Sequence, residues 1–177
     1  MTWDDEDFAG AKIALICDNH IITYLRDDID TIPYPGQWDL PGGGREGDES
    51  PIDCALRETE EEFGLQISPS RVRQLRKYSG VKSPGFVSYF CLCDVTKDEI
   101  ESIVFGDEGQ YWELMPINVF LEHEKAIEHL KDRLIAARDP LGIKPLYVAR
   151  LGEGYVFSSE SKAFDGVPVE KIEAIPP

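Results

Sequence analysis

Residues 43 to 65 read GGREGDESPIDCALRETEEEFGL, and this stretch decides the fold of the chain. Ser50 is a favourable N-cap, and Pro51 suits the first position of a helix. Gly64 stands where a helix ends in a left-handed residue. Side chains that recur at helical spacing predict a buried stripe, made of Ile52, Ala55, Leu56, Thr59 and Phe63. The sequence therefore predicts a glycine-rich loop followed by a helix over residues 51–63.

The predicted helix carries four glutamates, Glu58, Glu60, Glu61 and Glu62. Like charges at i,i+3 and i,i+4 spacing repel one another. A divalent metal that holds a phosphate-rich substrate would neutralise them. Arg57 precedes Glu61 by four residues, which lets it hold that carboxylate in place. The alternative, an ordinary solvated acidic face, leaves the neighbouring glycines and Arg57 unexplained.

The spacing resembles the Nudix box of the MutT-like Nudix hydrolases, G-x5-E-x7-R-E-U-x-E-E-x-G-U, where U is a bulky aliphatic residue. Thr59 is the one soft match, because it is polar where the pattern often has an aliphatic residue. The resemblance spans about residues 11–134 and includes the lead-in WDLPGG at residues 38–43. It implies an α/β class fold, an α/β/α sandwich with a mixed sheet. The matching positions are Gly43, Glu49, Arg57, Glu58, Glu61, Glu62 and Gly64.

The resemblance also implies a hydrolase that cleaves nucleoside diphosphate-linked compounds with Mg²⁺, which Mn²⁺ could replace. The implied metal ligands are Glu58, Glu61, Glu62 and the backbone carbonyl of Gly43. Glu61 or Glu62 is a candidate general base, and Glu108 is a candidate from a loop outside the box. Arg57 has an orienting role.

The substrate is less determined than the reaction. A (d)NTP pyrophosphohydrolase of MutT type is the default prediction, because marks of other subgroups are absent at their usual offsets. ADP-ribose, nucleotide-sugar or dinucleoside polyphosphate hydrolysis is the alternative. Candidate substrate-binding residues are Arg26 and Lys82 for phosphates, Trp38 for stacking on a base, and Gly42 for close backbone approach. Tyr34, Tyr78 and Phe86 are further aromatic candidates, although packing roles are common for such residues. A nucleotide-sensing or interaction module without catalysis is a hypothesis of another class.

Composition limits the partners. The chain has 177 residues and a formal net charge of −16, which disfavours nucleic-acid polymers and anionic membranes and leaves a small nucleotide as the expected ligand. The first residues lack the layout of a signal peptide, and no apolar run reaches transmembrane length, so we expect a cytoplasmic protein. A homodimer stays open. The four cysteines are expected to be reduced thiols, because the spacing of Cys91 and Cys93 does not suit zinc.

Outside the box helix, the pattern predicts strands at residues 12–17, 20–26, 66–67, 72–78, 86–93 and 110–114. Residues 27–35 are expected to form a polar loop, and residues 107–109 a turn. A short helix is predicted at residues 116–121 and a longer one at residues 124–137, with His123 and His129 as exposed or capping residues.

The C-terminal stretch differs from the rest. Residues 136–177 resemble a fragment of the glutamine amidotransferase domain of asparagine synthetases and their class II relatives. Those enzymes use an N-terminal cysteine, whereas here Met1 precedes Thr2, so that chemistry is not expected. We predict a domain over residues 1–135 and an appendage over 136–177. The appendage should contain a β-hairpin of residues 145–151 and 155–159 that extends the sheet or covers an edge strand. The alternative is a segment for self-association or for docking on a partner.

Overall fold

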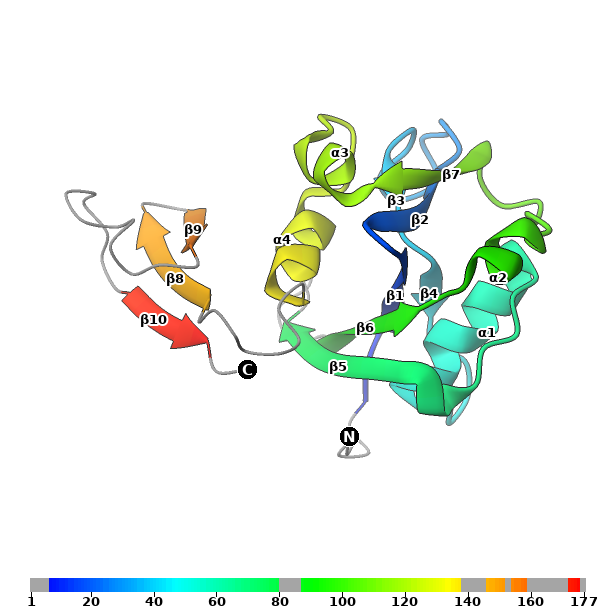
Figure 1. Cartoon of the computed structure of the whole chain (residues 1–177), viewed down its shortest axis with the longest axis horizontal. Coiled ribbons are helices and arrows are strands. Elements are labelled where there is room, and N and C mark those ends of the chain that lie inside the picture. The colour runs from blue at the N-terminus through cyan, green and yellow to red at the C-terminus, as the bar shows by residue number, and fades with distance from the viewer. Residues whose placement is uncertain (1–6, 80–86, 138–145, 152–153, 159–171, 176–177) are drawn as a thin grey trace. The chain divides into compact units, whose positions relative to one another are not determined.

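The computed structural model describes residues 7–79, 87–137, 146–151, 154–158 and 172–175 (Figure 1). The chain divides into two compact units, Met1–Arg133 and Leu134–Pro177. The assignment of residues 1–135 and 136–177 to separate domains stays a prediction.

The first unit is built on a mixed sheet of seven described strands in the order β3-β2-β1-β6-β5, with β4 paired to β1 and β7 paired to β2. β1 and β6 run parallel, and the other pairs are antiparallel. The strands are β1 (Gly10–Cys17), β2 (His20–Leu25), β3 (Trp38–Asp39), β4 (Gly42–Gly44), β5 (Val72–Ser79), β6 (Val87–Asp94) and β7 (Tyr111–Pro116).

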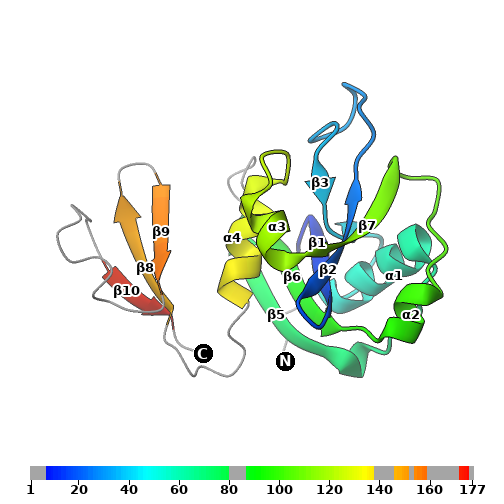
Figure 2. The ribbon, with the colours of Figure 1, turned by 45° about the horizontal axis from the view of Figure 1, so that its top comes forward.

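Helices cover both faces of this sheet (Figures 1 and 2). Alternate residues of a strand point to opposite faces, and both sets are buried in the central strands. Ile13 and Leu15 join Phe63 of the box helix in one hydrophobic cluster, whereas Ala14 and Phe90 are buried outside that cluster. The structure thereby confirms the predicted α/β class. The helices of this unit are α1 (Pro51–Phe63), α2 (Lys97–Glu101), α3 (Ile117–Glu122) and the beginning of α4 (Glu128–Ala137), with a 3₁₀ turn at Pro69–Arg71.

Helix α1 begins and ends where the sequence predicts. The Ser50 side chain accepts a hydrogen bond from the Asp53 backbone N–H, and Pro51 occupies the first turn. Gly64 has φ +67° and donates its N–H to the Glu60 carbonyl, so it ends the helix in the left-handed conformation. Of the predicted stripe, Ala55, Thr59 and Phe63 are fully buried, and Ile52 and Leu56 are half-buried.

Two sequence predictions are corrected by the fold. Residues 66–67 form no strand: they lead into the 3₁₀ turn, and Ile67 packs in the core without a strand partner. The second predicted helix begins at Glu128 rather than at residue 124. The backbone of Trp38 bonds to Lys125 and Ile127, which fixes the chain around Ala126 as an extended bridge.

Two features were not predicted. The glycine-rich stretch before α1 forms the short strands β3 and β4 rather than a plain loop. Helix α2 begins with a complete capping box between Thr96 and Glu99.

All four cysteines are free and buried, in agreement with the predicted reduced thiols. Among the described residues, no helix is long and apolar enough to cross a membrane.

The second unit contains an antiparallel hairpin, β8 (Leu146–Leu151) and β9 (Gly154–Ser158), as the sequence predicts. A further strand, β10 (Ile172–Ile175), pairs with β8 on its other side. These strands form a sheet of their own in the order β10-β8-β9, and the expectation that the hairpin extends the larger sheet or covers an edge strand stays a prediction. The pairing of β10 with β8 joins residues more than 20 positions apart, which local patterns do not reveal.

Candidate active site

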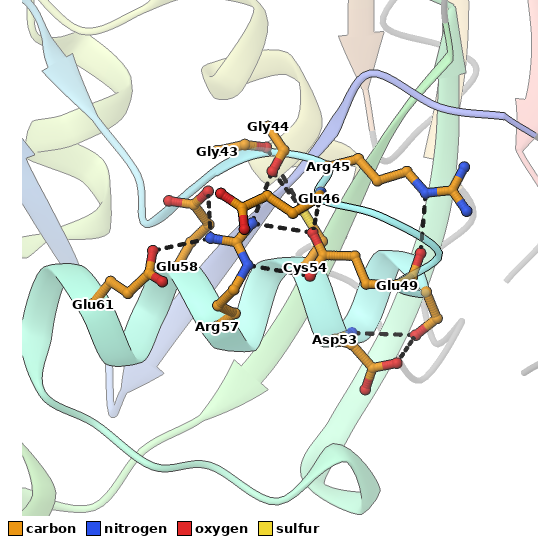
Figure 3. A network of polar contacts seen from close by, with 11 residues as sticks. Gly43, Gly44, Arg45, Glu46, Glu49, Asp53, Cys54, Arg57, Glu58 and Glu61 are labelled. Carbon is orange, nitrogen blue, oxygen red and sulfur yellow. Dashed lines mark hydrogen bonds and ion pairs between the residues drawn. The ribbon is translucent and has the colours of Figure 1, made fainter.

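Arg57 connects helix α1 to the strand of glycines beside it (Figure 3). Its guanidinium donates to both carboxylate oxygens of Glu49, at 3.1 and 3.0 Å, and to the Gly44 carbonyl at 2.8 Å. It also pairs with Glu58 at 3.1 Å and with Glu61 at 2.9 Å. The hydrogen bonds from Arg57 lower the pKa of Glu49, so that carboxylate stays ionised. Arg57 therefore ties three carboxylates to the backbone of β4, and its orienting role in a reaction stays a prediction.

The glycines of β4 bring the backbone against these carboxylates. Gly42 has φ +124°, and a Cβ there would lie 2.2 Å from the Ala11 carbonyl oxygen. A Cβ on Gly43 would lie 2.5 Å from the Glu58 carboxyl group. Glycine at both positions thus allows β4 to pair with β1 while its backbone touches the acidic face of α1.

A cavity of about 380 Å³ lies in front of β4. Glu58 and Glu62 of α1 line it together with Gly43, and Glu108 lines it from the loop that precedes β7. Glu62 is only 4% exposed and accepts a hydrogen bond of 3.0 Å from the Gly42 N–H. Burial raises the pKa of Glu62 to about 7, and burial also raises the pKa of Glu58. The cavity wall is therefore a place where added positive charge is favoured.

Two cations line the same cavity and share one carboxylate. Lys12 Nζ lies 2.9 Å from Asp39 Oδ2, and Arg26 lies 2.8 Å from the same oxygen. Asp39 is 2% exposed and also accepts from the Leu40 N–H at 2.7 Å. This arrangement fixes both cations at the cavity while Asp39 offsets part of their charge.

The donor set suits a hard divalent cation. Glu58 and Glu62 offer carboxylate oxygens on one wall of the cavity, beside the backbone of Gly43, and Mg²⁺ binds through a few carboxylates while it keeps several waters. Among the described residues, no three His, Cys, Asp or Glu side chains already form a metal-binding group. Figure 3 shows Arg57 paired with Glu58 and Glu61.

The structure does not bring every predicted residue to the cavity. Glu61 does not line it, and its side chain is 59% exposed and paired with Arg57. Trp38 is 5% exposed and packs edge-on against Tyr111 and His123, away from the cavity lining. Lys82 and Phe86 lie outside the described residues. Tyr78 packs under the Arg133 guanidinium at 4.6 Å.

Some cavity residues were missed by sequence reasoning, namely Lys12, Asp39 and His129, and Tyr34 was noted only as an aromatic candidate. Lys12 lies in an apolar strand pattern, where a lysine in a buried run is a signal for an ion partner. Asp39, inside the glycine-rich lead-in, carries a similar signal. Nothing in the local pattern distinguishes His129 from an exposed helical residue.

Comparisons with known proteins show what this chain is similar to. A family model described as NUDIX domain matches residues 9–137, and one described as Glutamine amidotransferase domain matches residues 125–166. Diphosphoinositol polyphosphate phosphohydrolase 2 of Mus musculus is 27% identical over 103 residues, which cover 55% of this chain and 58% of that protein.

Solved structures share the fold. A bifunctional NMN adenylyltransferase/ADP ribose pyrophosphatase of Francisella tularensis, complexed with AMP and manganese, superposes with a TM-score of 0.59 at 20% identity, over 76% of this chain and 42% of that one. A MutT protein of Methanosarcina mazei Go1 has a TM-score of 0.59 at 17% identity, over 76% of this chain and 95% of that one.

Proposed function

The chain belongs to the Nudix family, and from this premise we propose that it is a Mg²⁺-dependent hydrolase of nucleoside diphosphate-linked compounds. One observation carries the proposal: the buried Glu62 and the half-buried Glu58 share a cavity wall with the glycine backbone of β4. A buried acidic pair of this kind is costly unless a cation or a proton neutralises it.

In the proposed reaction, a water oxygen attacks a phosphorus of the diphosphate, and the bridging P–O bond breaks to give two phosphate products. Mg²⁺, when bound, would neutralise the diphosphate oxygens and acidify the attacking water. Glu58, Glu62 and the Gly43 carbonyl are the proposed ligands, and Mn²⁺ could take the same place. Glu61 is a further proposed ligand, but it pairs with Arg57 in the structure. To reach the cavity, its carboxylate would have to leave Arg57. Arg57 keeps β4 and α1 in register.

The base that takes the water proton lies on one of two walls. Glu62, on the α1 wall, is the base if Glu58 holds the metal without it. Glu108 lies on a different element, where it could act without being a metal ligand. Arg26 and Lys12 are placed to contact substrate phosphates, and Gly42 allows a phosphate to approach the backbone.

The identity of the substrate is also a proposal. The sequence favours (d)NTPs of MutT type, with ADP-ribose, nucleotide sugars and dinucleoside polyphosphates as alternatives. The similar proteins carry names of several substrate kinds, among them ADP-ribose and diphosphoinositol polyphosphates. Because this chain spans little more than half of the curated relative it matches, these names guide the choice of assay only. Cytoplasmic location and a homodimer stay predictions.

The test is product release from (d)NTPs, 8-oxo-dGTP, ADP-ribose, dinucleoside polyphosphates and nucleotide sugars with Mg²⁺ or Mn²⁺. We expect turnover of at least one compound and a loss of about 100-fold or more in Glu58→Gln, by analogy with the removal of other charge-stabilising groups. Glu60→Gln is the matched control, since Glu60 is exposed on the same helix and should leave the rate unchanged. Metal binding without turnover of any compound would instead support the nucleotide-sensing module.

The amidotransferase-like segment supports a separate prediction. Its match to residues 125–166 covers a fragment rather than a complete catalytic domain. We propose a structural or interaction role for the second unit, whose two outer strands, β9 and β10, each pair with β8 among the described residues. Outer strands of this kind are templates for pairing with another chain.

A further inference from the structure

The cavity has an aromatic side that the proposed reaction does not use. Tyr34, from the loop between β2 and β3, and His129, from the first turn of α4, both line it. Their ring centroids lie 5.6 Å apart with an interplanar angle of 48°. Pro33 and Ile127 line the cavity beside them. This wall is therefore apolar and aromatic, in contrast to the charged wall formed by α1, β1 and β3.

The loop that carries Tyr34 is built to hold it. Tyr34 has φ +56°, a conformation that a bulky side chain adopts only when its surroundings impose it. The loop is closed by backbone hydrogen bonds from Arg26 to Gln37 and from Gly36 to Asp27, each 3.0 Å long. The Arg26 side chain adds a bond of 2.9 Å to the Pro33 carbonyl. Arg26 thus links the position of the Tyr34 loop to the charged wall, where it also binds Asp39.

Charge limits what else the cavity can hold. Four carboxylates line it, Asp39, Glu58, Glu62 and Glu108, against two cations, Lys12 and Arg26. Both cations already share the Asp39 carboxylate. Divalent cations could balance this wall against a diphosphate. A sugar that carries many phosphates would meet too few cations among the described lining residues, whereas a nucleoside places its uncharged ring on the aromatic wall.

We infer that Tyr34 and His129 form a base-binding subsite, and that the substrate is a nucleoside diphosphate derivative rather than a base-free polyphosphorylated sugar. The inference rests on the proposed function for the reaction at the charged wall, but the binding of a base can be tested without any reaction. A base on an aromatic ring gains stacking energy whatever its identity, so the subsite defines a class of ligand and not one base.

The experiment measures the affinity of the whole protein for AMP and for ribose 5-phosphate by calorimetry with saturating Mg²⁺. Neither ligand has an anhydride bond, so neither is hydrolysed. We expect AMP to bind about tenfold or more tightly than ribose 5-phosphate. Tyr34→Ala and His129→Ala should each remove much of this preference, Tyr34→Phe should retain it, and ribose 5-phosphate affinity should not change. Alanine at position 34 needs the same backbone conformation, and thermal unfolding checks the fold.

Tyr111→Ala is the matched control, because Tyr111 is 47% exposed and packs on Trp38 outside the cavity. Equal affinities for AMP and ribose 5-phosphate, or an AMP preference that survives both Tyr34→Ala and His129→Ala, would overturn the subsite. If the protein still hydrolyses a nucleotide substrate in that case, the proposed reaction stands without the Tyr34–His129 subsite. Conversely, AMP binding that depends on Tyr34, with no anhydride hydrolysed, would support the subsite and refute the proposed reaction.

Discussion

Glu62→Gln should stabilise the metal-free protein while it removes activity. Glu62 is 4% exposed, and burial raises its pKa from the ordinary 4.5 to about 7. One pKa unit corresponds to about 1.36 kcal/mol, so ionising this carboxyl in the folded state costs about 3 kcal/mol. Glutamine is nearly isosteric, carries no charge, and keeps an oxygen that can accept the hydrogen bond from the Gly42 N–H.

The sign of the pH dependence follows from the raised pKa. The folded protein holds the Glu62 proton more tightly than the unfolded chain does, so the cost is absent below about pH 4.5 and complete above about pH 7. Urea denaturation in EDTA should show Glu62→Gln more stable than wild type by about 3 kcal/mol at pH 8.5, and by less than about 1 kcal/mol at pH 5.

Mg²⁺ at 1,000 times its Kd should reverse this order, since a ligand stabilises the folded state by RT ln(1 + [L]/Kd), about 4.1 kcal/mol at that concentration. Wild type should gain this stability and Glu62→Gln should gain less. Glu60→Gln, on the exposed side of the same helix, is the control and should follow wild type. Equal stability of Glu62→Gln and wild type at pH 8.5 in EDTA would refute the argument that Glu62 is buried at an energetic cost.

Three further predictions address the surroundings of this site. In Gly43→Ala, the new Cβ would meet the flexible Glu58 carboxyl group at 2.5 Å, so we expect kcat to fall about tenfold or more with little loss of stability; Gly44→Ala, whose nearest neighbour lies at 3.9 Å, should behave as wild type in the same assays. Arg57→Lys cannot keep the bidentate pair with Glu49, and thermal and urea unfolding should report a loss of about 2 kcal/mol. Hydrogen bonds from Arg71 lower the pKa of Glu99 to about 2. Wild type should therefore be more stable than Glu99→Gln above pH 4.5, by about 1 kcal/mol or less, and this advantage should decline as the pH falls toward 2. An advantage that does not change with pH would contradict this pairing.

Local sequence patterns were sufficient to predict where helix α1 begins and ends and which of its residues are buried. Its N-cap, its first-turn proline, its buried stripe and its left-handed Gly64 all act within a few residues of one another, and so does the contact between Arg57 and Glu61. Such interactions depend on sequence spacing alone, because the helix fixes the relative positions of residues three and four apart. The family resemblance rests on the same stretch, and the match over residues 9–137 confirms it.

Local patterns failed where a distant strand decides the conformation. The glycines of β4 become a strand only because β1 pairs with them, and residues 123–127 stay out of the helix because Trp38 binds their backbone. Backbone groups that are buried take whichever hydrogen-bond partners the sheet supplies, and those partners are remote in sequence.

The sequence by itself determined the acidic helix, its caps and the type of chemistry its oxygen ligands suit. Only the tertiary structure decided which groups face one another in the cavity. Lys12 and Arg26 meet at Asp39 because β1, β2 and β3 are aligned in one sheet, and Tyr34 meets His129 across 95 positions of sequence. Side chains this far apart in the chain come together through sheet pairing and helix packing. Residues throughout the core contribute to the energy of that packing, so no short segment of sequence determines it.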